Sequence, residues 1–213
     1  MTKAETYTLA TQLNGGTPIA DSLFESLLNM KKNVLEMSRD WVILRTFDSS
    51  ITFDSSDDYT GTKTLPSRFL RVYNPWDDRR QEQPGVYIVD SAGNKNPLKP
   101  IPFAQRFDYK DIDGYFYLDM KNSKIGRTGT LAGTLHLFFL QGTADFDADD
   151  DTWTFPLFSH PLLAYEVVIE YKGGVDWDTV NANQVPFNRN TVNTIMSQLA
   201  HWDARLQQAE LGI

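Results

Sequence analysis

Apolar residues recur at alternating steps of four and three in a segment near the start of the chain. This spacing predicts an amphipathic helix over about 21–41. Asp21 or Ser22 is suited to cap it, and Ser22 with Glu25 has the spacing of a capping box. We expect the apolar stripe to face the core of its own domain, and a subunit seam is the alternative. The stripe consists of Leu23, Leu27, Met30, Val34, Met37 and Trp41.

A second apolar stripe of the same kind lies near the other end of the chain. It predicts a helix over about 188–210, with Asn188 or Asn190 as the N-cap. Its members are Val192, Ile195, Leu199, Trp202, Leu206 and Ala209.

The segment 159–172 is apolar nearly all round. Ser159 can cap a helix there, Pro161 suits its first turn, and Gly173-Gly174 supplies a stop. A short helix with little polar surface is expected to be buried on most sides. The sequence therefore predicts a central buried helix between the two long ones.

Short apolar or alternating segments separated by turn residues fill the region 42–141. No helix-length segment separates them, so antiparallel pairing is expected. The predicted strands are 41–44, 51–53, 68–73, 86–89, 115–118 and 134–140.

These patterns together predict an α+β fold. We expect a helical bundle of the long N- and C-terminal helices plus the central buried helix, with an inserted antiparallel β-sheet or sandwich over about 42–141. Residues 1–18 contain Gly15-Gly16 and Pro18 and little periodicity, so they are expected to form a loosely held leader. The remainder, 19–213, is expected to be a single domain.

Composition narrows the class of protein. The net charge of −8 argues against a protein that binds the phosphate backbone of a nucleic acid over a broad surface, because such proteins are positively charged there. The chain has no cysteine, which excludes disulfides and thiolate chemistry. The N-terminus lacks the apolar core of a signal peptide, and no apolar run is long enough to span a bilayer. We expect a protein made and kept in a cytoplasm, without a membrane partner.

The acidic segment 145–151 carries carboxylates at alternate positions, as a calcium loop does. An EF-hand, however, needs glycine where Asp150 stands and glutamate where Pro156 stands. A solvated, mutually repelling loop is therefore the favoured interpretation, and no metal site is predicted. The three histidines lack zinc-helix spacing, and neither a Gly-x-Ser-x-Gly nor a Walker motif is present. We predict no catalytic residue, no cofactor and no enzymatic activity.

The order of elements and three short motifs resemble a known family. Leu65-Pro66-x-x-Phe69 follows the first helix and Asp113-Gly114-Tyr115 lies in the β region; Phe155-Pro156, with His160 and Leu162-Leu163, opens the central helix. The chain is similar in these features to the head-to-tail adaptor (neck or connector) proteins of tailed bacteriophages, including the tail-tubular-protein-A type.

This resemblance implies a structural virion protein of the phage neck, assembled in the host cytoplasm. Its partners would be further copies in a ring, commonly of twelve, together with the portal protein and a tail or nozzle protein. DNA would pass through the channel without sequence-specific binding, which suits an acidic chain. The C-terminal Leu211, Gly212 and Ile213 would dock on the portal. The bundle core would contain Leu162, Leu163, Tyr165, Leu23, Leu27, Met30, Val34, Trp41, Ile195, Leu199, Trp202 and Leu206.

A different class of function stays open beside this one. A β-rich carbohydrate- or receptor-binding tail protein would stack an aromatic ring on a sugar. The candidate rings are Trp76, Tyr87, Tyr115 and Trp153.

Overall fold

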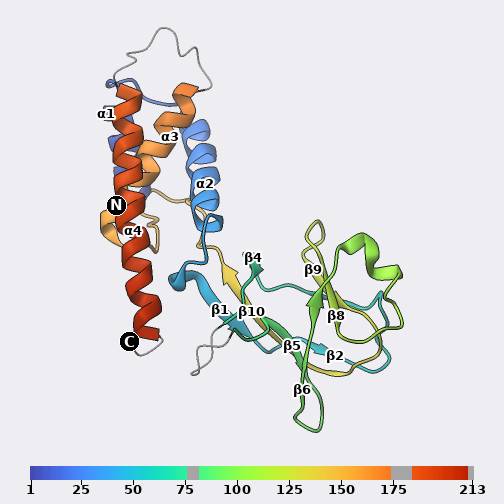
Figure 1. Cartoon of the computed structure of the whole chain (residues 1–213). Helices are drawn as coiled ribbons and strands as arrows, with labels where there is room; N and C mark the ends of the chain where they lie inside the picture. The colour runs from blue at the N-terminus through green and yellow to red at the C-terminus, as the bar shows by residue number, and fades with distance from the viewer. Residues whose placement is uncertain (76–81, 174–183, 211–213) are drawn as a thin grey trace. The chain divides into compact units, whose positions relative to one another are not determined.

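The computed structural model describes residues 1–75, 82–173 and 184–210 of the chain (Figure 1). The chain divides into two compact units. Unit 1 comprises Met1–Ile43 and Gly142–Ile213, and unit 2 is the continuous segment Leu44–Gln141. The β-rich insertion was predicted over about 42–141.

Unit 1 is built from helices, and α3 lies at its centre. Helix α3 contacts each of the other three long helices (Figure 1). Its Leu162, Leu163 and Val167 side chains are buried. A short 3₁₀ turn, η3 (Leu157–Ser159), precedes it. The helices described in this unit are α1 (Lys3–Leu13), α2 (Asp21–Met37), α3 (Pro161–Gly173) and α4 (Gln184–Glu210).

Helix α1 corrects the prediction of a loosely held leader. Thr2 caps it through a capping box with Glu5, and its Thr6 and Ala10 side chains are buried. The backbone N–H of Lys3 donates to the carbonyl of Asp151 (2.8 Å), which ties the start of the helix to a distant loop. This helix was not predicted from the sequence, because its surface is mostly polar and its apolar residues form no stripe.

Helix α2 begins at Asp21, as predicted, but its cap and its end differ from the prediction. Its N-cap is Ala20, and no side chain caps it. The predicted capping box is not formed, since the Glu25 carboxylate binds the Lys3 ammonium instead (2.7 Å). At the other end, the carbonyl of Leu35 accepts hydrogen bonds from the Ser38 N–H, the Ser38 hydroxyl and the Trp41 indole. The helix therefore stops at Met37, and Trp41 folds back beneath it.

Unit 2 contains a six-stranded sheet centred on β10. Strand β10 pairs antiparallel with β1, β2, β4 and β5, and β6 continues the sheet beyond β5. Residues 42–44, predicted as part of a strand, form a 3₁₀ turn, η1, that leads into β1. The strands are β1 (Arg45–Asp48), β2 (Thr52–Phe53), β4 (Phe69–Val72), β5 (Val86–Val89), β6 (Lys95–Pro97) and β10 (Gly133–Gln141).

A second, four-stranded sheet of unit 2 has the order β3-β9-β8-β7. Its β7–β8 pair is parallel, and residues 101–114 connect the two strands through the 3₁₀ turn η2 (Phe103–Phe107). The strands are β3 (Thr62–Thr64), β7 (Lys99–Pro100), β8 (Tyr115–Asp119) and β9 (Lys124–Arg127).

The prediction of a helical bundle with one inserted antiparallel sheet is wrong. The described residues form an α+β structure with two sheets, one of them partly parallel, and with four helices instead of three. The missed strands include β3, β6, β7 and β9, which are short and carry no apolar alternation. Strand β3, for example, is held in place by a partner distant in sequence, with Lys63 opposite Ile125 of β9.

Both sheets of unit 2 contribute to one apolar core. It includes Leu135, Leu137 and Phe139 from β10 and Phe116 and Ile125 from the second sheet. Burial of aromatic and branched side chains at about 25 cal/mol per Å² is the main stabilising term for such a core.

Arg127 is a charged residue within unit 2 that lies only 1% exposed. One guanidinium nitrogen donates to the carbonyls of Asp54 (2.9 Å) and Asp57 (3.0 Å), and the other donates to that of Gly129. Burial lowers the pKa of Arg127, and nearby carboxylates such as Asp113 oppose that shift. Arg127 thus holds the polar segment 54–58 against the sheet.

Candidate functional site

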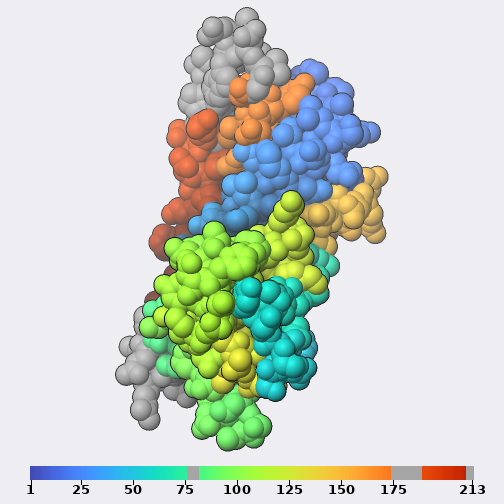
Figure 2. Space-filling model, turned by 90° about the vertical axis from the view of Figure 1, so that its right-hand side faces the viewer, coloured from blue at the N-terminus to red at the C-terminus, as the bar shows by residue number. Residues whose placement is uncertain are grey.

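The outer side of α2 carries an uncovered apolar stripe. Leu23, Met30, Val34 and Met37 are 44%, 41%, 57% and 53% exposed, and Leu27 between them is half-buried. We call these five residues the outer stripe. In Figure 2 the outer side of α2 (blue) faces the viewer. The prediction that Leu23, Met30 and Val34 lie in the core is therefore wrong.

A neighbouring face of α2 packs into unit 1 instead. Phe24, Leu28 and Leu35 are buried, and the Phe24 ring meets Tyr7 of α1 edge-on, with 4.9 Å between ring centres. The sequence thus contains two apolar stripes on one helix. The more regular of the two faces outward.

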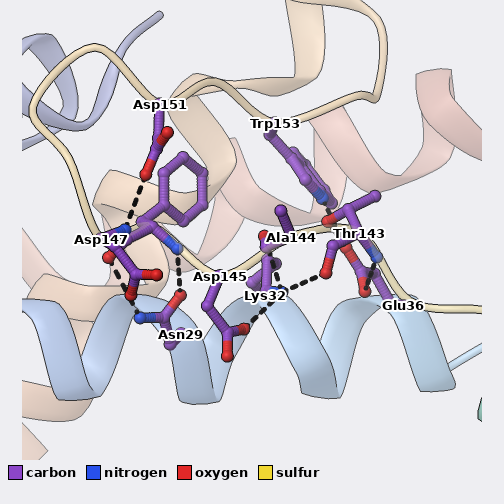
Figure 3. Close-up of polar contacts among 10 residues, drawn as sticks. Asn29, Lys32, Glu36, Thr143, Ala144, Asp145, Asp147, Asp151 and Trp153 are labelled. Atoms are coloured by element: carbon purple, nitrogen blue, oxygen red, sulfur yellow. Dashed lines mark hydrogen bonds and ion pairs between the residues drawn. The ribbon is translucent and has the colours of Figure 1, made fainter. Parts of the chain in front are cut away.

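Three polar residues of α2, Asn29, Lys32 and Glu36, bind the segment that follows unit 2. Figure 3 shows their side chains pointing from the helix toward residues 143–147. Asn29 makes a paired contact with the backbone of Phe146, accepting from its N–H (2.8 Å) and donating to its carbonyl (3.3 Å). Their spacing of three and four residues places all three on one side of the helix.

Lys32 is 1% exposed, and its ammonium group has three acceptors. It donates to the carbonyls of Thr143 (2.9 Å) and Ala144 (3.0 Å) and to the Asp145 carboxylate (2.8 Å) (Figure 3). All three donors of the ammonium group are thereby used. A buried charge satisfied in this way is retained, whereas one left unpaired is strongly destabilising.

Glu36 is fully buried and accepts three hydrogen bonds. Its donors are the Trp153 indole N–H (2.9 Å), the Thr143 backbone N–H (3.1 Å) and the Thr143 hydroxyl (Figure 3). The Trp153 ring in turn stacks on Phe155, with 4.2 Å between ring centres. Glu36 therefore joins α2 to residues on both sides of the acidic segment.

These contacts fix the rotation of α2 about its own axis. Turning the helix by one residue, about 100°, brings the outer stripe inward but carries Lys32 and Glu36 away from their partners. The buried Trp153 indole is then left without a hydrogen bond, at about 1–3 kcal/mol. Two backbone groups of the half-buried Thr143 lose their partners as well. The polar network consequently determines which face of α2 is presented.

The acidic segment 145–151 is ordered by the protein around it. The Asp151 carboxylate accepts the backbone N–H groups of Asp147 and Ala148, both at 2.7 Å, and these bonds lower its pKa. The carbonyls of Asp149 and Asp151 accept N–H groups of α1. The prediction of a solvated, mutually repelling loop did not include these contacts, because α1 was not predicted. The segment presents Asp147, Asp149 and Asp150 to solvent on a fixed backbone.

The remaining residues assigned to the bundle core lie as follows. Leu162, Leu163, Trp41 and Leu199 are buried, and Tyr165, Ile195, Trp202 and Leu206 are half-buried. The predicted docking residues Leu211, Gly212 and Ile213 lie outside the described residues.

The sequence reasoning missed Lys32, Glu36 and Asn29 as structural residues. Lysine and glutamate on a helix with an apolar stripe are normally solvent-facing. The one available signal was the second stripe of Phe24, Leu28 and Leu35.

The aromatic rings proposed for sugar stacking are occupied or buried where they are described. Trp153 is 3% exposed and Tyr87 stacks on His136, with 4.8 Å between ring centres. Tyr115 packs on Tyr109 at 4.7 Å, and Trp76 lies outside the described residues.

Two further kinds of site were searched for in the described part of the chain. No group of three or more histidine or acidic residues there is placed to hold a metal ion. No described helix is both long and apolar enough to cross a membrane.

Comparison with known proteins adds no further assignment. No protein-family model matches the chain, and no curated protein matches it.

Proposed function

We propose that this chain is a structural subunit of a bacteriophage neck, a head-to-tail adaptor that assembles as a ring between portal and tail. The observation that carries the proposal is the outer stripe on α2, Leu23 to Met37 at alternating steps of four and three. At 1.5 Å per residue the stripe is about 21 Å long. Exposed apolar faces of this kind characterise protein contacts, and this spacing suits a helix-to-helix seam.

The rigidity of α2 supports the same proposal. Because Lys32 and Glu36 hold the helix in one rotation, the outer stripe has no route into the core of its own unit. A second chain that packs on the stripe would bury these apolar side chains. A preorganised contact face lowers the entropy cost of association.

A ring needs two different complementary faces on each subunit, and it closes when the rotation between neighbours is a whole fraction of a turn. Twelve copies is the ring order that the sequence resemblance implies. The net charge of −8 suits a channel that lets DNA slide, since an acidic wall does not hold phosphates. The portal protein and a tail or nozzle protein are the proposed partners on the two sides of the ring.

The test places a charge in the outer stripe. Val34→Asp is expected to weaken assembly at least about tenfold, because an unpaired carboxylate would be buried in the seam. The folded subunit should lose no more than about 0.5 kcal/mol, since Val34 is exposed. Asn33→Asp is the matched control, because it adds the same charge on an exposed neighbouring position.

Assembly is measured by sedimentation velocity and electron microscopy, with and without the portal protein of the same phage. We expect the wild-type chain and Asn33→Asp to form rings on the portal, and Val34→Asp to form few. A wild-type chain that never joins the portal contradicts the adaptor proposal. Equal assembly by both variants contradicts the role of the outer stripe.

A further inference from the structure

Unit 2 contains an open cavity of about 470 Å³ that none of the preceding roles uses. One wall is the turn 64–69 and the other is formed by Met120 and Ser123 of the β8–β9 connection. The two walls are joined by a hydrogen bond from the Leu65 N–H to the Ser123 carbonyl (2.9 Å). The volume is within the range of ligand and side-chain binding sites.

Both walls of the cavity contain a residue in the left-handed backbone region. Arg68 has φ of 55° and Ser123 has φ of 52°, and no other non-glycine residue in the described chain has a positive φ. In the turn that closes with the Phe69 N–H on the Pro66 carbonyl, Arg68 stands at the third position. Glycine or asparagine is preferred where that position needs a positive φ. An arginine in this unfavourable conformation is a basis for inferring a role for its side chain.

The mouth of the cavity has an excess of positive charge. Arg68 is exposed and forms no ion pair with any residue that the structure describes. Lys124 donates to the Thr64 hydroxyl on the rim (2.7 Å), and Lys121 is exposed in the same connection. The nearby acid, Asp119, is bound by Asn122 (2.8 Å).

The cavity also offers an apolar surface beside this charge. Met120 is 53% exposed, and Leu65, Pro66 and Phe69 line the interior. A methionine at a rim adapts readily to the shape of a partner. The cavity is therefore suited to an acidic peptide segment whose apolar backbone or side-chain atoms can pack on this surface.

An acidic segment of this kind is found in unit 1. Unit 1 has 7 Lys and Arg against 16 Asp and Glu, a net charge of −9, whereas unit 2 has 13 against 12, a net charge of +1. The exposed Asp147, Asp149 and Asp150 concentrate this charge on an ordered loop, with Ala148 exposed among them. None of the three forms an ion pair shorter than 4.0 Å within the described residues, although the Lys3 charge is near.

We propose that the cavity of unit 2 receives the acidic loop 147–150 of a second copy of this chain. This inference rests on the proposed ring, because it supplies one of the complementary pairs of faces that a head-to-tail contact requires. Arg68 meets the carboxylates, and Met120 packs on the loop backbone beside Ala148. Charge complementarity of this type sets the register between neighbours and speeds their encounter.

The first test uses cysteine cross-linking in the ring assembled on the portal. The chain has no cysteine, so introduced thiols have no competing partner within it. Met120→Cys and Ala148→Cys chains are mixed, assembled and oxidised mildly. We expect a disulfide-linked dimer of the two variants. Ser91→Cys, on an exposed turn of unit 2, replaces Met120→Cys as the control and should give little dimer.

The outcomes separate the two proposals. Rings that form normally but cross-link no better through position 120 than through position 91 overturn the present inference and leave the adaptor proposal standing. A chain that stays monomeric with and without portal overturns both.

The second test separates the use of Arg68 from its effect on folding. Arg68→Gly removes the side chain at a backbone conformation that glycine adopts freely, so the melting temperature should stay equal or rise. Assembly should weaken about tenfold. Arg68→Lys keeps the positive charge, so this variant should retain most of the wild-type assembly. Wild-type assembly by Arg68→Gly contradicts the inference.

A charge exchange completes the test. Arg68→Glu alone should block the contact, and Arg68→Glu combined with Asp149→Lys should restore part of it. If the double variant assembles no better than Arg68→Glu alone, the loop is not the occupant of the cavity.

Discussion

Lys32 and Glu36 in unit 1 and Arg127 in unit 2 are charged side chains that are at most 1% exposed. Each side chain binds backbone groups of a loop and holds that loop on regular structure. The α2 pair also engages side chains, Asp145 and Trp153, whereas Arg127 binds carbonyl oxygens and leaves its Nε atom without a hydrogen-bond partner in the described structure.

The difference lies in what each arrangement controls. Arg127 fixes a local turn, so its loss should disturb residues 54–58 and little else. Lys32 and Glu36 fix the rotation of a helix, so their loss should alter the surface that α2 presents. A buried polar network can thus determine a contact face whose residues it never touches.

The largest expected effect is in unit 1. Glu36→Ala leaves the buried Trp153 indole and the half-buried Thr143 N–H without an acceptor and opens a cavity. We expect the free energy of unfolding to fall by about 3–4 kcal/mol. Glu36→Gln keeps one acceptor oxygen and should cost about 1–2 kcal/mol. Urea denaturation measures both.

A surface ion pair provides the control for that measurement. Glu25→Ala removes the partially exposed partner of Lys3 and should cost less than about 1 kcal/mol. If Glu36→Ala costs no more than Glu25→Ala, the network does not hold α2 in place.

A smaller effect is expected in unit 2. Arg127→Met keeps much of the buried side-chain volume but removes the bonds to the carbonyls of Asp54, Asp57 and Gly129. The free energy of unfolding should fall by about 2 kcal/mol. The loss of hydrogen bonds is partly offset, because the variant no longer buries a charged guanidinium at a desolvation cost. Hydrogen exchange should quicken at residues 54–58 and stay unchanged in α2. Faster exchange in α2 would remove the distinction between the two arrangements.

The smallest effect is a pH dependence of the acidic segment. Hydrogen bonds from Ala148 and Asp147 hold the pKa of Asp151 below its ordinary value of 3.8. The ionised Asp151 carboxylate therefore stabilises the folded state fully above that value. This contribution is lost as the pH falls through the lower pKa of the folded state. The difference in melting temperature between wild type and Asp151→Asn should be constant above about pH 5 and shrink below it. A difference that grows on acidification would contradict this assignment.

Much of the element order was predictable, and the reasons are visible in particular residues. Strand β10 and helix α3 are long and apolar, so their burial followed from pattern alone. Helix α4 was predicted from 188 and begins at Gln184. Strands such as β3, Thr62–Thr64, have no pattern to detect and depend on β9 for their pairing.

The orientation of α2 was not predictable from its own sequence. The choice between its two apolar stripes is made by Thr143, Asp145 and Trp153, more than 100 positions away. Only the folded chain brings these residues to Lys32 and Glu36. Helix α1 was missed for a similar reason, since its contacts with Asp149 and Asp151 are what identify it.

The pairing of β1 with β10 has a consequence for how the protein can change. The chain enters unit 2 through β1 and leaves it through β10, and Arg45 lies opposite Leu140. Partners in an antiparallel pair have Cα atoms about 5 Å apart, so a turn of two residues can bridge the same gap. Unit 2 is thus an inserted unit whose first and last strands lie next to each other. Recombination can exchange it as one block while the helices on either side keep their sequence and their connection.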